Sequence, residues 1–589
     1  MRSSFLLIAV FAVLMFNSAA AQWQELDALP RYETVQERLL RSTYVAPPAV
    51  SIMPPLNPVR AMAEYEEIDG IIVRWAYGTQ NLLLSQITDA AQEEGKVWIM
   101  VRPGTSDSTN IKTYLAGRNI PLTNLDFVSV NTNSIWCRDY GPWTVYDVTN
   151  DSIGILDFRY NRPRPQDDLI PVALASRWNL PLYQTLQSPD SLVHTGGNFM
   201  VDGFDRGFSS ELIINENPHQ TSATIDSAMR RYSGLSSYIK MDPLPYDVIH
   251  HIDMHMKLLD EETLLIGEYP VNVADYAVIE STVDYLETLV GPYGRPYTII
   301  RIPMPPDAQG RYPNNGSDYL TYTNSVIINK TVLVPIYSLP QDQLALDIYA
   351  DAMPGYTILG FDCNSIIPQL GAIHCITKEI GVREPVHFAH KRILSVDDTT
   401  EIRFEARIKA RSGIDSAVVF WTSDSATTFH RLDLTDSSGM FSATIAPQPF
   451  GSTVWYYIQA YAGSGREVTK PLVGAAGAYS FEVVDSTTTS VEDDPQPFVF
   501  GLEQNYPNPF NPATSIRFRL PHSAEVTLKV FDVLGREIAV VFEGSIEAGA
   551  HTAIWTPTGL ASGVYYYRLS ARMANGQTFT DGGKAILLK

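Results

Sequence analysis

Four side chains at separated points of the chain have the types that could carry out covalent chemistry together. Cys375, in GAIHCIT, is one of only three cysteines in 589 residues, and Asp139 lies in WCRDYGPW. His251 and Asp253 are two residues apart in HHIDMH. Carboxylates bind guanidinium groups through paired hydrogen bonds, a thiolate attacks carbon, and an imidazole transfers protons. These residue types therefore fit the hydrolytic release of ammonia from a guanidinium group.

Each residue also has an ordinary structural explanation. A lone cysteine is most often buried packing, and an odd number of cysteines leaves at least one unpaired. A disulfide between Cys363 and Cys375 is a further alternative. Asp139 beside Arg138 is typical of a loop ion pair, and Asp202, in HTGGNFMVDG, is typical of a turn.

The segment 250–257 is compatible with two kinds of site. In an extended strand, side chains two residues apart face the same side, so His251 and Asp253 would point into one site. His255 continues that spacing, and a His-x-Asp-x-His pattern could instead bind zinc or iron, which makes a metallohydrolase the alternative enzyme. By the same alternation His374 faces away from Cys375, so a catalytic histidine has to come from elsewhere in the chain.

Residues 22–383 must position these side chains, and their pattern is that of an α/β or α+β domain. Apolar residues at helical spacing predict helices within 82–95, 273–291 and 342–355. Short apolar runs predict strands at 96–103, 297–305 and 356–361, and two strands joined near Asn329. One ordinary core of this size would be large, and repeated strand–helix modules around a centre would resolve that difficulty.

The rest of the chain is expected to be β-rich. Residues 384–485 contain short alternating segments separated by turn residues, which is typical of an immunoglobulin-like β-sandwich. Residues 486–500 are polar and contain proline, as expected of a linker, and residues 501–589 form a further small β domain.

The two ends of the sequence and its charge bear on location and partners. Residues 1–21 combine one early arginine, an apolar run and closing alanines, which predicts a secretory signal peptide and an exported mature chain. No other stretch is long and apolar enough to span a membrane. The formal charge of −22 argues against nucleic acid as a partner and is compatible with cationic substrates.

The C-terminal segment resembles a known sorting domain. NYPNPFNP, VFDVLGREI and GSIEAGAHTAIWTPTGLASGVYYYRL are similar to the C-terminal domain of proteins exported by the type IX secretion system of Bacteroidetes-like bacteria. The resemblance implies contact with that machinery, a route through the periplasm and outer membrane, and a secreted or cell-surface location.

Five stretches of the first domain resemble one enzyme family. WCRDYGPW, TGGNFMVDG, HIDMH, TNSVIINK and GAIHCIT occur in the order found in Porphyromonas-type peptidylarginine deiminases and the related agmatine deiminases. The resemblance covers most of residues 50–383. It implies a pseudo-symmetric five-bladed α/β propeller, the pentein fold, with the site at its centre and neither a cofactor nor a metal.

The resemblance also implies a role for each matching residue. Cys375 would be the nucleophile that forms a covalent thiouronium intermediate, and His251 the general acid and base. Asp139 and Asp253 would bind the guanidinium group. Asn324 matches an active-site asparagine of the family. Trp136 would pack against the aliphatic part of the substrate side chain, and Asp202 would line the site.

The substrate class is less narrowly defined by the sequence. Arg162 and Arg164, in YNRPRPQDD, correspond to arginines thought to hold the carboxylate of a C-terminal arginine in the peptidyl enzymes. That pair favours an arginine-containing peptide as the substrate, although two solvated charges in a loop would also explain the pair. Val248 offers no polar group that would help to hold a terminal carboxylate. The alternatives are a deiminase of agmatine or another small guanidine, and a surface adhesin that carries a decayed deiminase domain.

Overall fold

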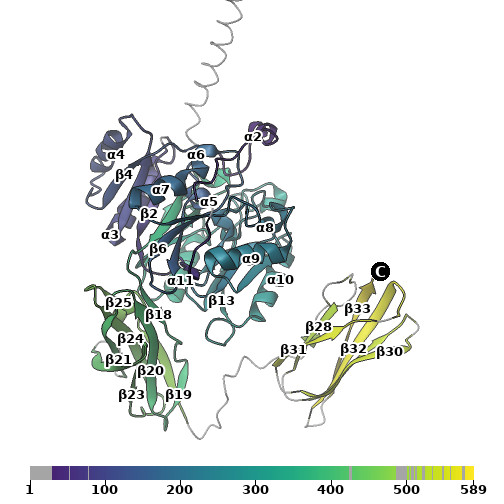
Figure 1. Cartoon of the computed structure of the whole chain (residues 1–589). Helices are drawn as coiled ribbons and strands as arrows, with labels where there is room; N and C mark the ends of the chain where they lie inside the picture. Colours follow the sequence, from purple (N-terminus) through teal and green to yellow (C-terminus); the bar gives the residue numbers. More distant parts are fainter. Residues whose placement is uncertain are drawn as a thin grey trace, which may run out of the picture. The chain divides into compact units, whose positions relative to one another are not determined.

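The computed structural model describes residues 29–485, except 52, 77 and 424–427, and most of residues 501–588. Gaps in that last stretch fall at 503–504, 506–507, 509, 511–513, 521–523, 534, 547–548, 558 and 574–577. The predicted signal peptide (1–21) and linker (486–500) lie outside the described residues. The chain divides into two compact units, Met1–Asp485 and Ser486–Lys589, each of which is described by itself (Figure 1).

Five small sheets of three or four strands make up the first part of the larger unit. In hydrogen-bonded order they are β1 (Val59–Ala61), β5 (Trp143–Asp147), β6 (Ile153–Asp157) and β7 (Leu182–Gln184); β10 (Ser237–Met241), β9 (Arg206–Ser210) and β8 (Met200–Val201); β11 (Met256–Leu258), β12 (Thr263–Glu268) and β13 (Thr298–Pro303); β14 (Val326–Ile328), β15 (Thr331–Ile336) and β16 (Thr357–Asp362); and β17 (Thr377–Gly381), β2 (Ile68–Arg74), β3 (Lys96–Val101) and β4 (Leu125–Ser129).

Every one of these sheets contains the same unit, in which an antiparallel pair is followed by a parallel pair. The pairs β5–β6, β8–β9, β11–β12, β14–β15 and β17–β2 are antiparallel, and the next strand in each sheet runs parallel. A parallel neighbour requires a crossover connection, which is usually helical. The last strand, β17, pairs with β2 near the start of the domain, so the fifth sheet joins the two ends of this part of the chain.

Helices supply the crossovers and cover the sheets. They are α2 (Val35–Leu40), α3 (Asn81–Glu94), α4 (Asp107–Ala116), α5 (Cys137–Tyr140), α6 (Pro165–Asp168), α7 (Ile170–Trp178), α8 (Leu212–Asn215), α9 (Ser222–Ser233), α10 (Tyr276–Glu287) and α11 (Asp342–Ala352). Short 3-10 turns are η1 (Gly196–Asn198), η2 (Ile252–Met254), η3 (Pro313–Asn315), η4 (Ile367–Gln369) and η5 (His374–Ile376). The three helices predicted from apolar spacing correspond to α3, α10 and α11.

The local sequence explains why α3 forms where it does. Leu84, Ile87 and Ala91 are buried at helical spacing along one face, and the helix ends at Gly95. The following strand β3 is buried at five of its six positions, as expected of a strand covered on both faces.

Nine strands and one 3-10 turn form the second part of the larger unit. They are β18 (Val386–Ala389), β19 (Ser395–Asp397), β20 (Ile402–Ala410), β21 (Ile414–Thr422), β22 (His430–Ser437), β23 (Met440–Ile445), β24 (Thr453–Ala462), β25 (Glu467–Lys470), β26 (Tyr479–Val484) and η6 (Gly474–Gly477). The first half of β22 pairs with β21 and its last residues pair with β23, so the strand passes from one layer to the other. These strands enclose their own apolar cluster.

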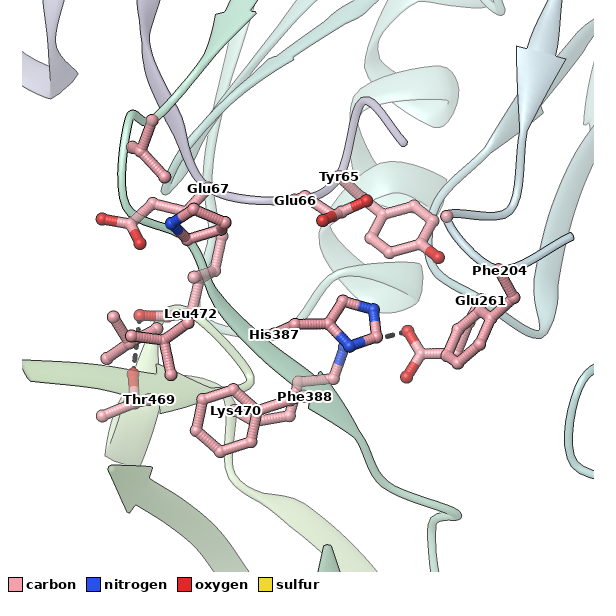
Figure 2. A pocket seen from close by; sticks show the side chains of 15 residues that line it. Tyr65, Glu66, Glu67, Phe204, Glu261, His387, Phe388, Thr469, Lys470 and Leu472 are labelled. Carbon is pink, nitrogen blue, oxygen red and sulfur yellow. Dashed lines mark hydrogen bonds and ion pairs between the residues drawn. The ribbon is translucent and has the colours of Figure 1, made fainter. Parts of the chain in front are cut away.

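The two parts of the larger unit contact each other through several ion pairs. Nζ of Lys470 lies 2.9 Å from Oε2 of Glu261, and Arg466 forms an ion pair with Glu67. Figure 2 shows a pocket between the two parts, where Tyr65 and Glu67 lie near side chains of the β-strand part.

The smaller unit consists of two antiparallel sheets with a separate apolar cluster. Their strands are β27 (Gly501–Leu502), β28 (Thr514–Leu520), β31 (Gly549–Trp555), β30 (Glu537–Ile546), β29 (Ala524–Phe531), β32 (Gly563–Met573) and β33 (Thr578–Leu587). Across the part of the chain that the structure describes, no helix has the length and apolar character needed to cross a membrane.

Candidate active site

The chemically competent residues meet in a buried site formed by turns and short helices. Asp139 lies in the single-turn helix α5, and Cys375 lies in η5 just before strand β17. His251 and Asp253 flank the start of η2, and Asn324 precedes β14 by two residues. All five side chains are buried. The site therefore takes its residues from at least four of the separated sequence stretches.

The expectation of an extended strand around His251 is wrong. His251 itself has extended dihedral angles, but Ile252–Met254 form a 3-10 turn. A turn does not place residues two apart on one face, so the alternation argument does not explain why His251 and Asp253 converge. Both side chains nevertheless contact one nitrogen, Nη2 of Arg31.

The guanidinium group of Arg31, near the beginning of the described chain, occupies the centre of the site. Its Nε donates a 2.9 Å hydrogen bond to Oδ2 of Asp139, and its Nη2 donates a 2.8 Å hydrogen bond to Oδ1 of the same carboxylate. Nη2 also donates to Oδ2 of Asp253 at 3.2 Å. The Arg31 side chain is fully buried. A forked arrangement of this kind is the usual geometry of arginine recognition by carboxylates.

The thiol and the imidazole approach different nitrogens of that guanidinium. Sγ of Cys375 lies 2.5 Å from Nη1 of Arg31 and 3.2 Å from Oδ1 of Asn324. Nδ1 of His251 lies 2.5 Å from Nη2, and its Nε2 lies 3.0 Å from the hydroxyl of Thr195. The thiol and the imidazole thus contact the two terminal nitrogens bound to one carbon, Cζ of Arg31.

A glycine leaves room for this arrangement. A Cβ added to Gly197, in the Gly-Gly loop of η1, would lie 1.9 Å from Nη2 of Arg31 and 2.6 Å from Nδ1 of His251. It would also lie 2.9 Å from Oδ2 of Asp253. Any side chain at this position would occupy the volume that the guanidinium and its partners share.

His374 contacts two carboxylates, one of which, Asp253, also contacts Arg31. Its Nδ1 lies 2.8 Å from Oδ2 of Asp253, and its Nε2 lies 2.7 Å from Oε2 of Glu64. His374 makes these contacts rather than pairing with the thiol of Cys375. Glu64 in turn forms an ion pair with the buried Lys257, which continues the polar network away from the site.

The electrostatic environment fixes the protonation states. Burial, followed by the charge of Arg31, lowers the pKa of His251 to about 3. Burial raises the pKa of the Cys375 thiol well above its usual value, although Arg31 opposes that shift. Burial also raises the pKa of Asp139 and of Asp253. Arg31 and the neighbouring histidines together outweigh burial and hold both carboxyl pKa values below their ordinary range. With Arg31 bound, the carboxylates are charged while the imidazole and the thiol are neutral.

Main-chain groups on both sides of Arg31 are held as well. Nε1 of Trp136 donates a 2.6 Å hydrogen bond to the carbonyl of Leu29. Nη2 of Arg164 donates to the carbonyl of Pro30 at 2.7 Å, and Nε of Arg162 donates to the carbonyl of Arg31 at 3.2 Å. The amide of Arg31 donates to the carbonyl of Gln369 at 3.1 Å.

Comparison with known proteins identifies the family. The model of the Porphyromonas-type peptidyl-arginine deiminases matches residues 60–380, which is more than half of the chain. The chain belongs to this deiminase family. Residues 504–578 match the secretion system C-terminal sorting domain, which indicates an exported protein that is secreted or bound to the cell surface.

Relatives with deiminase names match about half of the chain. A protein of Pectobacterium atrosepticum, provisionally named an agmatine deiminase, is 25% identical over 350 residues, or 54% of this chain and 93% of its own. A protein of Shewanella frigidimarina with the same provisional name is 24% identical over 302 residues, or 46% of this chain and 80% of its own. The solved structure of the Enterococcus faecalis agmatine deiminase has a TM-score of 0.50 at 20% identity, covering 57% of this chain and all of the other. The fold of residues 60–380 is therefore that of the deiminases.

The structure differs from one expectation, for Asp202, and from one alternative, for His255. The carboxylate of Asp202 does not contact the bound guanidinium, because its Oδ1 accepts hydrogen bonds from the amides of Phe204 and Arg206 and so caps a turn. His255 does not join His251 and Asp253 as a third ligand, and no group of three possible metal ligands assembles anywhere in the described residues. The 3-10 turn between His251 and His255 breaks the spacing on which the metal pattern depended.

The three cysteines lie apart from one another and do not pair. Cys137, Cys363 and Cys375 are all buried and unpaired, so the alternative disulfide between Cys363 and Cys375 is absent. Burial raises the pKa of Cys137 to about 12. Of the three, Cys375 is the one whose sulfur contacts the guanidinium.

Sequence reasoning did not identify Arg31, Gly197, His374 or Glu64 as parts of the site. Arg31 lies in LPRYETVQE, which has no feature of a substrate or a catalytic residue apart from the Thr34–Glu37 capping box that begins α2. The Gly-Gly pair in HTGGNFM was a usable signal for Gly197, because adjacent glycines mark positions where another group approaches the backbone closely.

Proposed function

We propose that the chain is an exported peptidylarginine deiminase, which converts peptidyl-arginine and water into peptidyl-citrulline and ammonia. One observation carries this proposal, namely that an arginine within a polypeptide chain lies between Asp139, Asp253, His251 and Cys375 with its backbone hydrogen-bonded on both sides. A site for a small guanidine alone has no need of the backbone contacts.

The proposed reaction has two balanced halves. Sγ of Cys375 attacks Cζ of the substrate, the thiol proton passes by way of His251 to Nη2, and the Cζ–Nη2 bond breaks to release ammonia. The Sγ–Cζ bond remains as a thiouronium intermediate. A water molecule then gives one proton to His251 and attacks Cζ as hydroxide. As the Sγ–Cζ bond breaks, the hydroxyl proton passes to Sγ and restores the thiol, and citrulline leaves with its neutral ureido group. His251 finally releases its proton to solvent. Asp139 and Asp253 hold the positive charge of the guanidinium throughout.

The remaining residues would bind the peptide. Asn324 accepts a hydrogen bond from the amide of Ala372 while its Oδ1 also contacts Sγ of Cys375, so it orients the thiol. Arg162 and Arg164 would hold the carbonyl of the reacting arginine and that of the residue before it. If arginine is the last residue of the peptide, Arg162 faces its terminal carboxylate instead. The Trp136 indole would hold a carbonyl rather than wall only the aliphatic stem.

Deimination of agmatine or another small guanidine is the second candidate. The names of the relatives from Pectobacterium atrosepticum and Enterococcus faecalis favour it. The residues that contact the guanidinium serve both candidates equally, and the backbone contacts of Trp136, Arg162 and Arg164 favour the first. The assembled set of buried polar residues disfavours a decayed, purely adhesive protein.

The proposal also covers the fold of the chain and its route of export. We take the five sheets with their shared antiparallel–parallel unit as the five blades of a propeller, and the nine strands of residues 384–485 as an immunoglobulin-like domain. The sorting domain would engage the type IX secretion machinery, with the signal peptide (1–21) directing the first membrane passage.

One assay decides between these functions. The purified chain is offered a peptide with an internal arginine, a peptide ending in arginine, free arginine and agmatine, and citrulline and ammonia are measured, with and without exhaustive chelation. Faster turnover of a peptide than of agmatine supports the proposal. Agmatine as the best substrate would move the assignment to small guanidines, and a loss of activity on chelation would revive the metallohydrolase.

A further inference from the structure

We propose that Arg31 is the first substrate of its own active site, so that the N-terminal segment Leu29–Arg41 blocks the site until Arg31 is converted to citrulline within the same molecule. The inference rests on the proposed function and adds a modification site and a substrate class to it. The substrate class is an arginine within a continuous peptide.

The first support is the match between Arg31 and the reacting groups. Its guanidinium contacts both carboxylates, the imidazole and the thiol at once, and no part of the side chain is exposed. A structural arginine needs carboxylate partners but has no need of a thiol and an uncharged imidazole on either side of its Cζ.

The second support is the path of the backbone. The carbonyls of Leu29, Pro30 and Arg31 are each bound by a side chain of the site, and the chain continues from Tyr32 into helix α2. The described segment therefore runs through the site on both sides of the Arg31 side chain, with a bend at Arg31 and Tyr32, and an internal arginine of another peptide would have to bind in the same way.

The third support is the anchoring of the segment after Arg31. Nε of Arg164 donates a 2.6 Å hydrogen bond to Oε1 of Glu37, which is itself buried within α2. The Thr34–Glu37 capping box fixes the start of that helix, and Arg41 donates to the carbonyl of Asn161. These contacts hold the segment in place, and its covalent connection to β1 makes the binding intramolecular, so its effective concentration exceeds that of dilute external substrates.

The chemistry follows the two halves of the reaction given above. Arg31 loses Nη2 as ammonia and becomes thiouronium-linked to Cys375, and water then replaces sulfur at Cζ to give citrulline. The ureido group of citrulline is neutral, so the charge-assisted hydrogen bonds to Asp139 and Asp253 are lost. The segment consequently binds more weakly after one turnover, and the site becomes available to external peptides.

The test is peptide mapping by mass spectrometry of the full chain, digested with a protease that does not cut at arginine. Residue 31 should be mostly citrulline in the wild-type protein and entirely arginine in Cys375→Ala and in His251→Gln. Arg38 and Arg41 are exposed on the same segment and serve as internal controls. They should remain arginine in all samples.

A mixing experiment shows whether the conversion is intramolecular. Cys375→Ala protein is incubated with active Arg31→Ala protein, and residue 31 of the inactive copy should stay arginine because it is held in its own site. Conversion of that residue by the second copy would overturn the intramolecular assignment, as would citrulline at Arg38 and Arg41 to the same extent as at Arg31.

The same preparations separate this inference from the function on which it rests. If the wild-type or Arg31→Ala protein deiminates an external arginine peptide while residue 31 of the wild type remains arginine, the inference fails and the proposed function stands. If neither protein deiminates any arginine compound, both fail. Faster turnover of the external peptide by freshly made Arg31→Ala protein than by wild type before its conversion is the expected kinetic result.

Discussion

Nδ1 of His374 lies 2.8 Å from the same Asp253 oxygen that accepts a hydrogen bond from Arg31. The other ring nitrogen contacts Glu64 at 2.7 Å, so the imidazole lies between two carboxylates and orients the one that faces the substrate. Oδ1 of Asp253 is buried and has no hydrogen-bond partner among the described residues. His374 therefore provides much of the support that this carboxylate receives from protein groups other than Arg31.

Replacement of His374 by Ala should lower the specificity constant for arginine peptides by roughly ten- to a hundredfold. A hydrogen bond to a charged group is worth about 1.5–3 kcal/mol, and about 1.4 kcal/mol corresponds to tenfold. Steady-state kinetics measure the effect, and thermal unfolding shows whether the variant is folded. An unchanged specificity constant in a folded variant would contradict the orienting role.

Replacement of Gly197 by Ala should nearly abolish substrate binding. The added Cβ would lie 1.9 Å from the Nη2 position of the guanidinium and cannot move away from the backbone of η1. We expect at least about a hundredfold loss in specificity constant, the equivalent of roughly 2.8 kcal/mol. Activity close to that of the wild type would mean that the guanidinium of a substrate does not lie where that of Arg31 lies.

Replacement of Cys375 by Ala should remove turnover by several orders of magnitude, which is the usual loss for a nucleophile. Cys363→Ala is the matched control, because Cys363 is equally buried but does not contact the guanidinium. Kinetics with an arginine peptide give the comparison. Equal losses in the two variants would indicate a structural rather than a chemical role for the sulfur of Cys375.

Replacement of Arg162 by Ala should separate peptides from agmatine. Its Nε donates to the carbonyl of Arg31, an atom that agmatine lacks. The specificity constant should fall about tenfold or more for a peptide ending in arginine, because a charge-assisted hydrogen bond is lost, while agmatine turnover stays unchanged. An equal loss for both substrates would place Arg162 outside the peptide-binding groups.

The charge of Arg31 should be visible in the titration of His251. Burial and Arg31 both disfavour the imidazolium and lower the pKa of His251 to about 3. Removing the guanidinium in a Cys375→Ala background should therefore raise this pKa toward the ordinary value of about 6.5. Imidazole NMR signals of Cys375→Ala and Cys375→Ala/Arg31→Ala proteins report the change. An identical titration would mean that Arg31 is not beside His251 in solution.

The lowered pKa of His251 also makes the free energy of unfolding depend on pH. Between about pH 3 and pH 6.5 the unfolded chain protonates His251 while the folded chain does not, so the free energy of unfolding falls as pH falls through that window. The contribution is fully present above the unfolded pKa.

The sequence was informative where a pattern is local and uninformative where two distant segments meet. Apolar spacing was sufficient to predict α3, including its end at Gly95, because burial of one helix face and a glycine stop are local properties. The order of strands could not be obtained this way, since the pairing of β17 with β2 joins residues about 300 positions apart and leaves no periodic trace.

The residues of the candidate site could likewise be predicted only in part from the sequence. Family resemblance brought Cys375, His251, Asp139 and Asp253 into one list, and the structure places them around one guanidinium. The error for Asp202 arose because a carboxylate that caps a turn and one that faces a substrate have the same letter in the sequence. Arg31 was missed because its role depends only on what surrounds it in space.

If Arg31 is converted as proposed, each molecule carries a permanent chemical mark of its own first reaction. A chain whose site has assembled and reacted once carries one positive charge fewer than a newly made chain, and that difference persists however far the protein travels from the cell. Isoelectric focusing or mass measurement of the protein outside the cell would then report the fraction of molecules that had become competent, without any added substrate. The fraction of molecules with citrulline at position 31 would then equal the fraction that had folded and completed one deimination.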